Sequence, residues 1–294
     1  MPEREDVFDG FEEAIRARPS ENPWQSHDGG EGSTYLPDHG LLGTLLGIPI
    51  SEGRQSESGR LAKAIDAWVA FELRRCGFDA DEVWPRLVKP RVLPRELGLY
   101  IEGLPRSQRA EAERRLVGNK RAAPSDARVL GRAYVKQVDV VIAQWARGPE
   151  LLISTKSMVS SFRNNLPNRF EESYGDAKNL RGRYPLVSMG FLFLLRSNVL
   201  EERGTFDRVI DMLKKLQGES DAYDATCAIV AEWSDDDFSG VTLHQDVVPS
   251  ELQTGRFLAT LVEKVLEYTP VDMHVEVRSR REHRAFDVKE PEDD

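Results

Sequence analysis

Cysteine and long apolar runs are scarce in this sequence. The chain of 294 residues contains only Cys76 and Cys227, which argues against a disulfide framework and against a four-ligand zinc site. No stretch approaches the roughly 20 apolar residues that a membrane helix needs. The acidic, polar start lacks the pattern of a secretory signal. We therefore expect a cytoplasmic protein with no membrane partner.

Several common chemical motifs are also missing. There is no Walker loop and no G-x-G-x-x-G after a strand, which argues against ATP or NAD as a cofactor. There is no G-x-S-x-G nucleophile elbow. His244 and His274 have neither a partner at i+4 nor a neighbouring cysteine, so they are expected to be structural or surface residues rather than metal ligands.

Positive charge is in the minority overall but concentrated in one region. The formal net charge is -10. Between Arg86 and Lys136, however, thirteen basic residues stand against five acidic ones. Such a block could neutralise phosphates on a nucleic acid. It could equally be a solvated surface whose charges balance acids elsewhere.

Hydrophobic periodicity predicts a mixed α/β protein. Helices are expected at 59–77, 105–117, 167–181, 205–217 and 250–268, and strands at 134–144, 150–156, 184–196 and 225–233. Residues 1–58 are predicted to form an N-terminal arm, with loop from 20 to 58. Residues 59–130 would be a helical region for DNA or dimer contacts, 131–275 an α/β core with a mixed central sheet flanked by helices, and 276–294 a polar tail.

The strands around Gly148 carry charged side chains at apolar positions. Side chains alternate between the faces of a strand, so Ser154 and Lys156 point one way and Thr155 points the other way, into the core. If the two strands pair antiparallel, Asp139 lies at the same edge. A carboxylate and an ammonium there suit a divalent cation held by oxygen ligands and waters, placed against a phosphate.

This pattern resembles the PD-(D/E)XK nuclease superfamily, which pairs an Asp on one strand with (D/E)-x-Lys on the next. Asp139 and Lys156 match, but Ser154 replaces the second acid. The same Ser-x-Lys variant is found in type II restriction endonucleases of the Cfr10I/NgoMIV-like group, where a Glu on the following helix supplies the missing carboxylate. The resemblance implies a restriction-endonuclease-like core.

In this sequence, Glu171 and Glu172 are the candidates for that helical carboxylate. The apolar stripe of the helix is predicted to be Leu166, Phe170, Tyr174, Ala177 and Leu180. At about 100° per residue, Glu171 flanks this stripe and Glu172 lies nearly opposite. We therefore expect Glu171 to be the metal ligand, with the register uncertain by one residue.

Other positions follow from the resemblance. The segment after Lys156 is similar to one that enters the major groove, so Arg163, Asn164, Asn165 and Arg169 are candidates for DNA binding, by base reading or by phosphate contacts. Glu72 lies on the apolar stripe of the 59–77 helix. It could be the Glu that an N-terminal helix donates to the site in many members, or it could simply pair with Arg75.

The leading expectation is a type II restriction endonuclease that uses Mg²⁺, or Mn²⁺ in its place, to cut specific sequences in double-stranded DNA. Asp139 and Glu171 would hold the metal, Lys156 would position the attacking water, and Ser154 would line the site. Palindromic DNA favours a homodimer or a higher homo-oligomer, and a cognate methyltransferase would protect the host. The alternatives are a repair or defence nuclease specific for structure or modification, and a decayed, non-catalytic DNA-binding module.

Overall fold

A six-stranded mixed sheet forms the centre of the molecule. The computed structural model describes residues 6–26, 33–54, 59–117, 119 and 121–285. The sheet order is β10-β9-β8-β7-β6-β3. Its strands are β3 (Val83–Trp84), β6 (Val140–Gln144), β7 (Gly148–Met158), β8 (Ser188–Arg196), β9 (Ala225–Glu232) and β10 (Thr242–Leu243). β7, β8 and β9 run parallel, whereas β3, β6 and β10 pair antiparallel with their neighbours. The predicted mixed α/β architecture is confirmed.

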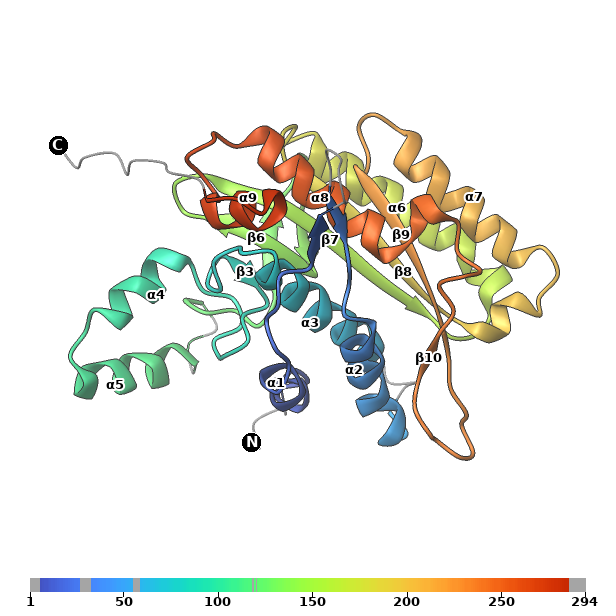
Figure 1. Cartoon of the computed structure of the whole chain (residues 1–294), viewed down its shortest axis with the longest axis horizontal. Helices are drawn as coiled ribbons and strands as arrows, with labels where there is room; N and C mark the ends of the chain where they lie inside the picture. The colour runs from blue at the N-terminus through green and yellow to red at the C-terminus, as the bar shows by residue number, and fades with distance from the viewer. Residues whose placement is uncertain (1–5, 27–32, 55–58, 118, 120, 286–294) are drawn as a thin grey trace.

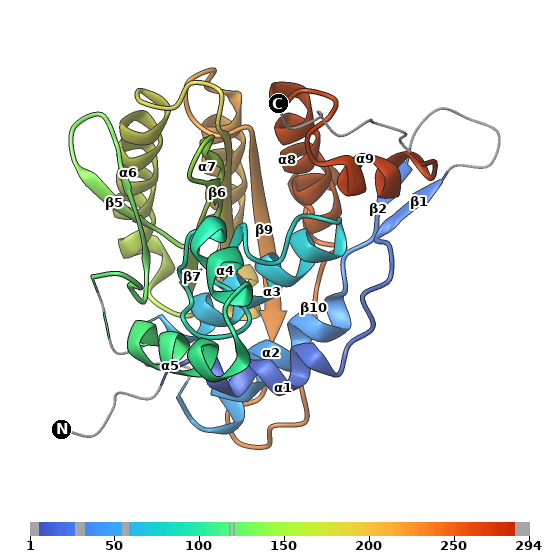
Figure 2. The same cartoon turned by 90° about the vertical axis from the view of Figure 1, so that its left-hand side faces the viewer.

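Helices cover both faces of the sheet, as Figure 2 shows from the side. One face packs against α6 (Phe162–Arg181) and α7 (Thr205–Gly218), and the other against α3 (Arg60–Arg75) and α8 (Thr254–Tyr268). Alternating residues of β7 pack into the hydrophobic cores on the two faces of the sheet. Leu152 faces α6 and α7, whereas Leu151 and Ile153 face α3 and α8. Because both faces of the sheet are covered, β8 is a nearly continuous apolar run.

The N-terminal segments belong to the core on the α3 side. They comprise α1 (Asp9–Arg16), a small ribbon of β1 (Trp24–Ser26) and β2 (Ser33–Tyr35), and α2 (His39–Ser51). Leu41, Leu42, Leu45 and Leu46 of α2 are all fully buried. Each such side chain contributes roughly 1.5–3 kcal/mol of transfer free energy. The expected N-terminal arm is therefore, over its described part, a section of the main core.

The prediction of a loop from 20 to 58 was wrong for α2. Its residues are buried on nearly every side, so no amphipathic period marks it, and its glycines and Pro49 gave turn signals. Gly47 meets a packing demand instead, because a Cβ there would lie 3.1 Å from the ring of Phe238. Residues 27–32 and 55–58 of the predicted loop lie outside the described part of the chain.

Two smaller units and a C-terminal helix complete the fold. α4 (Arg95–Glu102) and α5 (Arg106–Val117) form a helical hairpin at one end of the molecule (Figure 1). β4 (Ala127–Leu130) and β5 (Val135–Val138) form a two-stranded ribbon, named here the β4–β5 hairpin. The predicted tail contains α9 (Val275–Glu282), and its last residues, 286–294, are not described. In the described ranges, no helix combines the length and apolar character needed to span a membrane.

Candidate active site

The predicted strand pair is present, with one difference at Asp139. Val140 pairs with Ile153 in an antiparallel register, as the sequence predicted. The first strand is interrupted at Asp139, however. Before this residue the chain forms β5 and pairs with β4, and after it the chain forms β6 and pairs with β7. Asp139 therefore lies at the junction between the β4–β5 hairpin and the central sheet, half-buried beside the middle of β7.

A hydrogen bond from β7 fixes the Asp139 carboxylate. The backbone N–H of Thr155 donates to Asp139 Oδ2 at 3.0 Å. The Thr155 side chain points to the α3 face, as predicted, and its hydroxyl donates to Asp66 Oδ1 at 2.5 Å. Thr155 thus connects Asp139 with the fully buried carboxylate of Asp66 on α3.

Asp66 and Lys63 add an ionisable pair that the sequence analysis did not identify. Lys63 Nζ lies 3.0 Å from Asp66 Oδ2. The pKa of Asp66 is raised to about 6, because burial and, to a lesser degree, the carboxylate of Asp139 raise it while Lys63 opposes the shift. Burial opposes the charge on Lys63, but the carboxylates of Asp66 and Asp139 outweigh it and raise the pKa of the ammonium. Asp139 and Asp66 therefore act on one another electrostatically.

Lys156 and Glu172 meet on the opposite face of β7. Lys156 Nζ donates to Glu172 Oε1 at 3.0 Å, and Arg169 Nη1 donates to Glu172 Oε2 at 2.6 Å. Burial alone would raise the pKa of Glu172, but these two cations together lower it. Because the lowered pKa keeps this carboxylate ionised, Glu172 supplies a fixed negative charge beside the Lys156 ammonium.

The helical phase predicted for α6 was wrong by one residue. Glu171 is exposed and points away from β7, whereas Glu172 reaches Lys156. Polar residues occupy the middle of the buried face, namely Ser173, Asp176 and Asn179. Phe170 and Tyr174 stack at its edge with ring centroids 6.1 Å apart. An apolar stripe read from the sequence was therefore rotated relative to the face that packs.

Tyr223 is anchored to α6. The Tyr223 hydroxyl donates to the backbone oxygen of Ser173 at 3.0 Å. Ser154 is 7% exposed and lies on β7 two residues before Lys156. Burial, and then the carboxylates nearby, including those of Glu172 and Asp139, raise the pKa of Tyr223 and keep it neutral.

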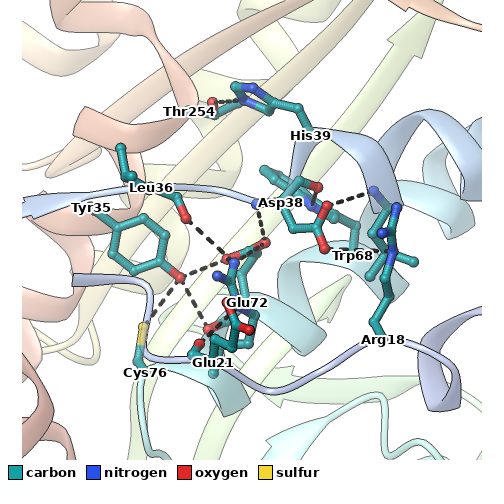
Figure 3. Close-up of polar contacts among 12 residues, drawn as sticks. Arg18, Glu21, Tyr35, Leu36, Asp38, His39, Trp68, Glu72, Cys76 and Thr254 are labelled. Carbon is teal, nitrogen blue, oxygen red and sulfur yellow. Dashed lines mark hydrogen bonds and ion pairs between the residues drawn. The ribbon is translucent and has the colours of Figure 1, made fainter. Parts of the chain in front are cut away.

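Glu72 lies outside this site, and its predicted catalytic position was wrong. It is fully buried on α3, where Arg75 Nη1 donates to both carboxylate oxygens at 2.8 and 3.0 Å. The Tyr35 hydroxyl and the backbone N–H of Asp38 complete its partners (Figure 3). This pairing with Arg75 is the alternative that the sequence left open. It ties α3 to β2 and to the start of α2.

The DNA-binding candidates occupy the first turns of α6. Arg163, Asn164 and Asn165 are all exposed, and Arg169 is half-buried because it pairs with Glu172. The helix begins at Phe162, five residues earlier than predicted, and Pro167 lies inside it on the exposed side. The first turn of α6 is separated from Lys156 by only a short segment of chain.

The basic block is only partly a free surface. Arg86 pairs with Asp81, Lys89 with Asp9, and Arg91 with acids of the N-terminal segment. Arg91 is 4% exposed and is a core residue. Lys120 lies outside the described residues. The exposed positive charge left in this region is mainly that of α5 and of Arg128 and Arg132 in the β4–β5 hairpin.

The carboxylates fit a hydrated Mg²⁺ better than a fully protein-bound ion. Mg²⁺ is usually held by one or two carboxylates together with waters and a substrate phosphate. Asp139 and Asp66 supply two such groups next to one another, and Glu172 lies across β7 with Lys156. Among the described residues, these three carboxylates do not gather into a cluster with all donors within 4.8 Å. The remaining positions on the ion would therefore belong to water and phosphate oxygens.

Comparison of the chain with models of protein families, with curated proteins and with solved structures gives no match. The functional argument therefore depends on the geometry of the site itself.

Proposed function

We propose that this chain is a Mg²⁺-dependent endonuclease that hydrolyses phosphodiester bonds in double-stranded DNA, with a restriction-endonuclease-like core. The observation that carries the proposal is the arrangement around β7. Asp139 binds the backbone of Thr155, and Lys156 extends to a helical glutamate, Glu172. In this proposal, the scissile phosphate would bind near these three side chains, which come from the residue before β6, from β7 and from α6.

Each side chain has a distinct task in this proposal. Asp139, with Asp66 behind it, holds the cation, and Lys156 orients the attacking water and offsets charge that develops on the phosphate. Glu172 holds the lysine and takes the role that the sequence analysis gave to Glu171. The cation, when bound, lowers the pKa of a water and stabilises the leaving oxygen. Mn²⁺ would serve in place of Mg²⁺ because it accepts the same oxygen ligands.

If the chain is a restriction endonuclease, the exposed start of α6 would enter the major groove of the DNA. Arg163 would bond a guanine edge, and Asn164 or Asn165 an adenine edge. A palindromic site calls for a homodimer or a higher homo-oligomer, and host DNA would need a cognate methyltransferase. A cytoplasmic location follows from this proposal, because the substrate is intracellular DNA.

The test is incubation of the purified chain with unmethylated phage DNA, with and without Mg²⁺, followed by gel electrophoresis. Discrete bands that require Mg²⁺ are expected. Asp139→Ala and Lys156→Ala should abolish them, since each removes a group that acts in the transition state. Lys215→Ala is the matched control, because this exposed lysine of α7 also pairs with a carboxylate.

Other outcomes separate the alternatives. A smear, or cleavage only of branched, nicked or modified DNA, would replace sequence specificity with structure or modification specificity. Tight DNA binding without cleavage in Mg²⁺ or Mn²⁺, unchanged by Lys156→Ala, would mean a decayed, non-catalytic module. Full turnover in either alanine variant would show that the site is misassigned.

A further inference from the structure

Three metal-binding side chains converge at the β3 edge of the sheet, away from Asp139. Glu82 directly precedes β3, Glu150 lies near the start of β7, and His274 directly precedes α9. One carboxylate oxygen from each glutamate and one ring nitrogen of the histidine lie within 4.8 Å of one another. The exposed fractions of the three side chains are 6%, 9% and 4%, respectively. Figure 1 places α9 beside this end of the sheet.

The two carboxylates divide their oxygens between two partners. Arg147 Nη2 lies 3.2 Å from Glu82 Oε1, and Arg147 Nη1 lies 3.4 Å from Glu150 Oε1. The Oε2 atoms of both glutamates turn instead toward His274, whose Nε2 lies 3.2 Å from Glu150 Oε2. Arg147 therefore fixes the outer oxygens and leaves the inner ones facing a common centre.

One of these inner oxygens has no hydrogen bond. Glu82 Oε2 is buried and accepts none from any described residue, and His274 Nδ1 lies 3.9 Å away, beyond hydrogen-bonding distance. A buried carboxylate oxygen without a partner costs free energy that a bound cation would recover. Glu82 as a whole is 4% exposed, so bulk water does not supply the missing partner.

We propose that Glu82, Glu150 and His274 form a binding site for one divalent transition-metal ion of the Zn²⁺ type, separate from the site around Asp139. An imidazole with two carboxylates is a donor set that such ions accept, and it differs from the all-oxygen set that Mg²⁺ prefers. Donor atoms on one tetrahedral Zn²⁺ lie about 3.3–3.5 Å apart, so small side-chain rotations would close the cluster. Water or an external ligand would take the fourth position.

The net charge of the cluster favours binding of a cation. Arg147 is shared between two carboxylates, and Arg95, 3.8 Å from Glu82, already pairs with Asp79 at 2.9 Å. One negative charge therefore remains on the cluster while the imidazole is neutral. Because the three donors come from distant segments of the chain, the ion would clamp α9 to the edge of the sheet.

The experiment measures Zn²⁺ binding to the full-length protein after removal of metals with a chelator. Competition with a chromophoric chelator gives the stoichiometry and affinity. We expect one tight site per chain, weakened at least about 100-fold by His274→Ala or Glu150→Gln. Zn²⁺ should also raise the melting temperature of the wild-type protein by several degrees, and not that of these variants.

Two controls distinguish this site from its rivals. His244→Ala removes a histidine that also pairs with a glutamate, Glu232 at 2.6 Å, and should leave binding unchanged. Asp139→Asn removes a carboxylate of the proposed nuclease site and should also leave binding unchanged. Loss of binding in Asp139→Asn with retention in His274→Ala would overturn the proposal, whether or not the chain cleaves DNA.

A second measurement avoids dependence on variants that fold poorly. Co²⁺ in a four- or five-coordinate site absorbs visible light more strongly than aqueous Co²⁺. The wild-type protein should show this absorption, Zn²⁺ should abolish it, and the conservative Glu82→Gln should weaken it. Absence of the absorption, together with no Zn²⁺ binding, would overturn the proposal.

Discussion

Lys156 is held by a partner that could be exchanged during a reaction. Its ammonium lies 3.0 Å from Glu172, on a side chain that is 25% exposed, so a phosphate can approach it. A charge-assisted hydrogen bond of this kind fixes direction as well as charge. In the proposed enzyme, this contact keeps the lysine extended until the DNA phosphate provides a second anion.

Substitution of Glu172 should therefore affect catalysis much more than substitution of Glu171. Glu172→Gln removes the charge that orients Lys156, and we expect cleavage to fall by about 100-fold or more. Glu171→Gln is the matched control, because this neighbour is exposed and should retain nearly full activity. Single-turnover cleavage rates measure both. The reverse ranking would return the role to Glu171.

Asp66 should give the folded protein a specific dependence on pH. Its pKa is raised from 3.8 to about 6, so between these values the folded state binds a proton that the unfolded state does not. The free energy of unfolding should therefore fall by about 1–3 kcal/mol as the pH rises from about 4 to about 6, and this contribution should be constant above that range.

Urea unfolding of the wild-type protein and of Asp66→Asn across this pH range checks the prediction. The difference between the two proteins should contain the slope, since asparagine does not titrate. Asp126→Asn is the control, because it removes a more exposed carboxylate 3.8 Å from the same Lys63 and should leave the slope in place. An unchanged slope in Asp66→Asn would reject this origin. If ionised Asp66 helps to hold the metal, cleavage should increase as the pH rises through about 6.

Among the elements, α6 contributes Glu172 to the candidate site and also binds the β4–β5 hairpin through a side chain. The Asn179 side chain of α6 accepts hydrogen bonds from the backbone N–H groups of Ala133 and Tyr134 and donates to the Tyr134 oxygen. Gly131 permits this approach, because a Cβ there would lie only 2.2 Å from the Asn179 amide nitrogen. The hairpin is therefore fastened to the same helix that carries Glu172.

Asn179→Ala should loosen the hairpin while the sheet remains intact. The substitution removes three hydrogen bonds from a side chain that is 5% exposed, so we expect a loss of about 2–4 kcal/mol in the free energy of unfolding. Hydrogen exchange should accelerate at residues 131–138 and not in β8. Asn164→Ala, at an exposed position of the same helix, should change stability by less than about 0.5 kcal/mol. Equal protection of the hairpin in both variants would contradict the role of Asn179 as its fastening.

Periodicity located some elements closely. The predicted helix at 59–77 and strand at 225–233 agree with α3 and β9 within two residues. It failed for α2, which is apolar on nearly every side, and for the phase of α6, whose buried face contains polar residues. In both cases the surroundings of the helix, which its own sequence does not contain, determine which side packs.

For the whole molecule, the net charge of -10 means that DNA binding would depend on a local surface. We expect the cleavage-deficient Asp139→Ala to bind duplex DNA with an affinity that falls steeply with salt. Adding Arg163→Ala should reduce the slope of log K against log salt by about 1. Adding Arg256→Ala instead, on the opposite face of the sheet in α8, should leave it unchanged. Fluorescence anisotropy at several salt concentrations measures this, and equal slopes in the two double variants would remove α6 from the DNA contact.

Some residues of the two candidate sites could be predicted from the sequence, and others could not. Asp139, Ser154 and Lys156 could be placed together because strand alternation and a short turn fix their relation. Asp66 could not, because it lies off the apolar stripe of α3, although this helix is buried on nearly every side in the structure. Glu82 and His274 are 192 positions apart, and only the packing of α9 brings them to Glu150.

The alternation of β7 side chains between the two faces of the sheet also bears on how refolding should be measured. Ser154 and Lys156 face α6, while Thr155 between them faces Asp66 on α3. A chain in which β7 slipped by one residue would exchange these faces. The Lys156 ammonium would then point toward Asp66, and Glu172 would keep only Arg169 as its partner. Such a product could match the native secondary structure by circular dichroism. Recovered function, rather than recovered ellipticity, is therefore the measure of correctly paired molecules after denaturation.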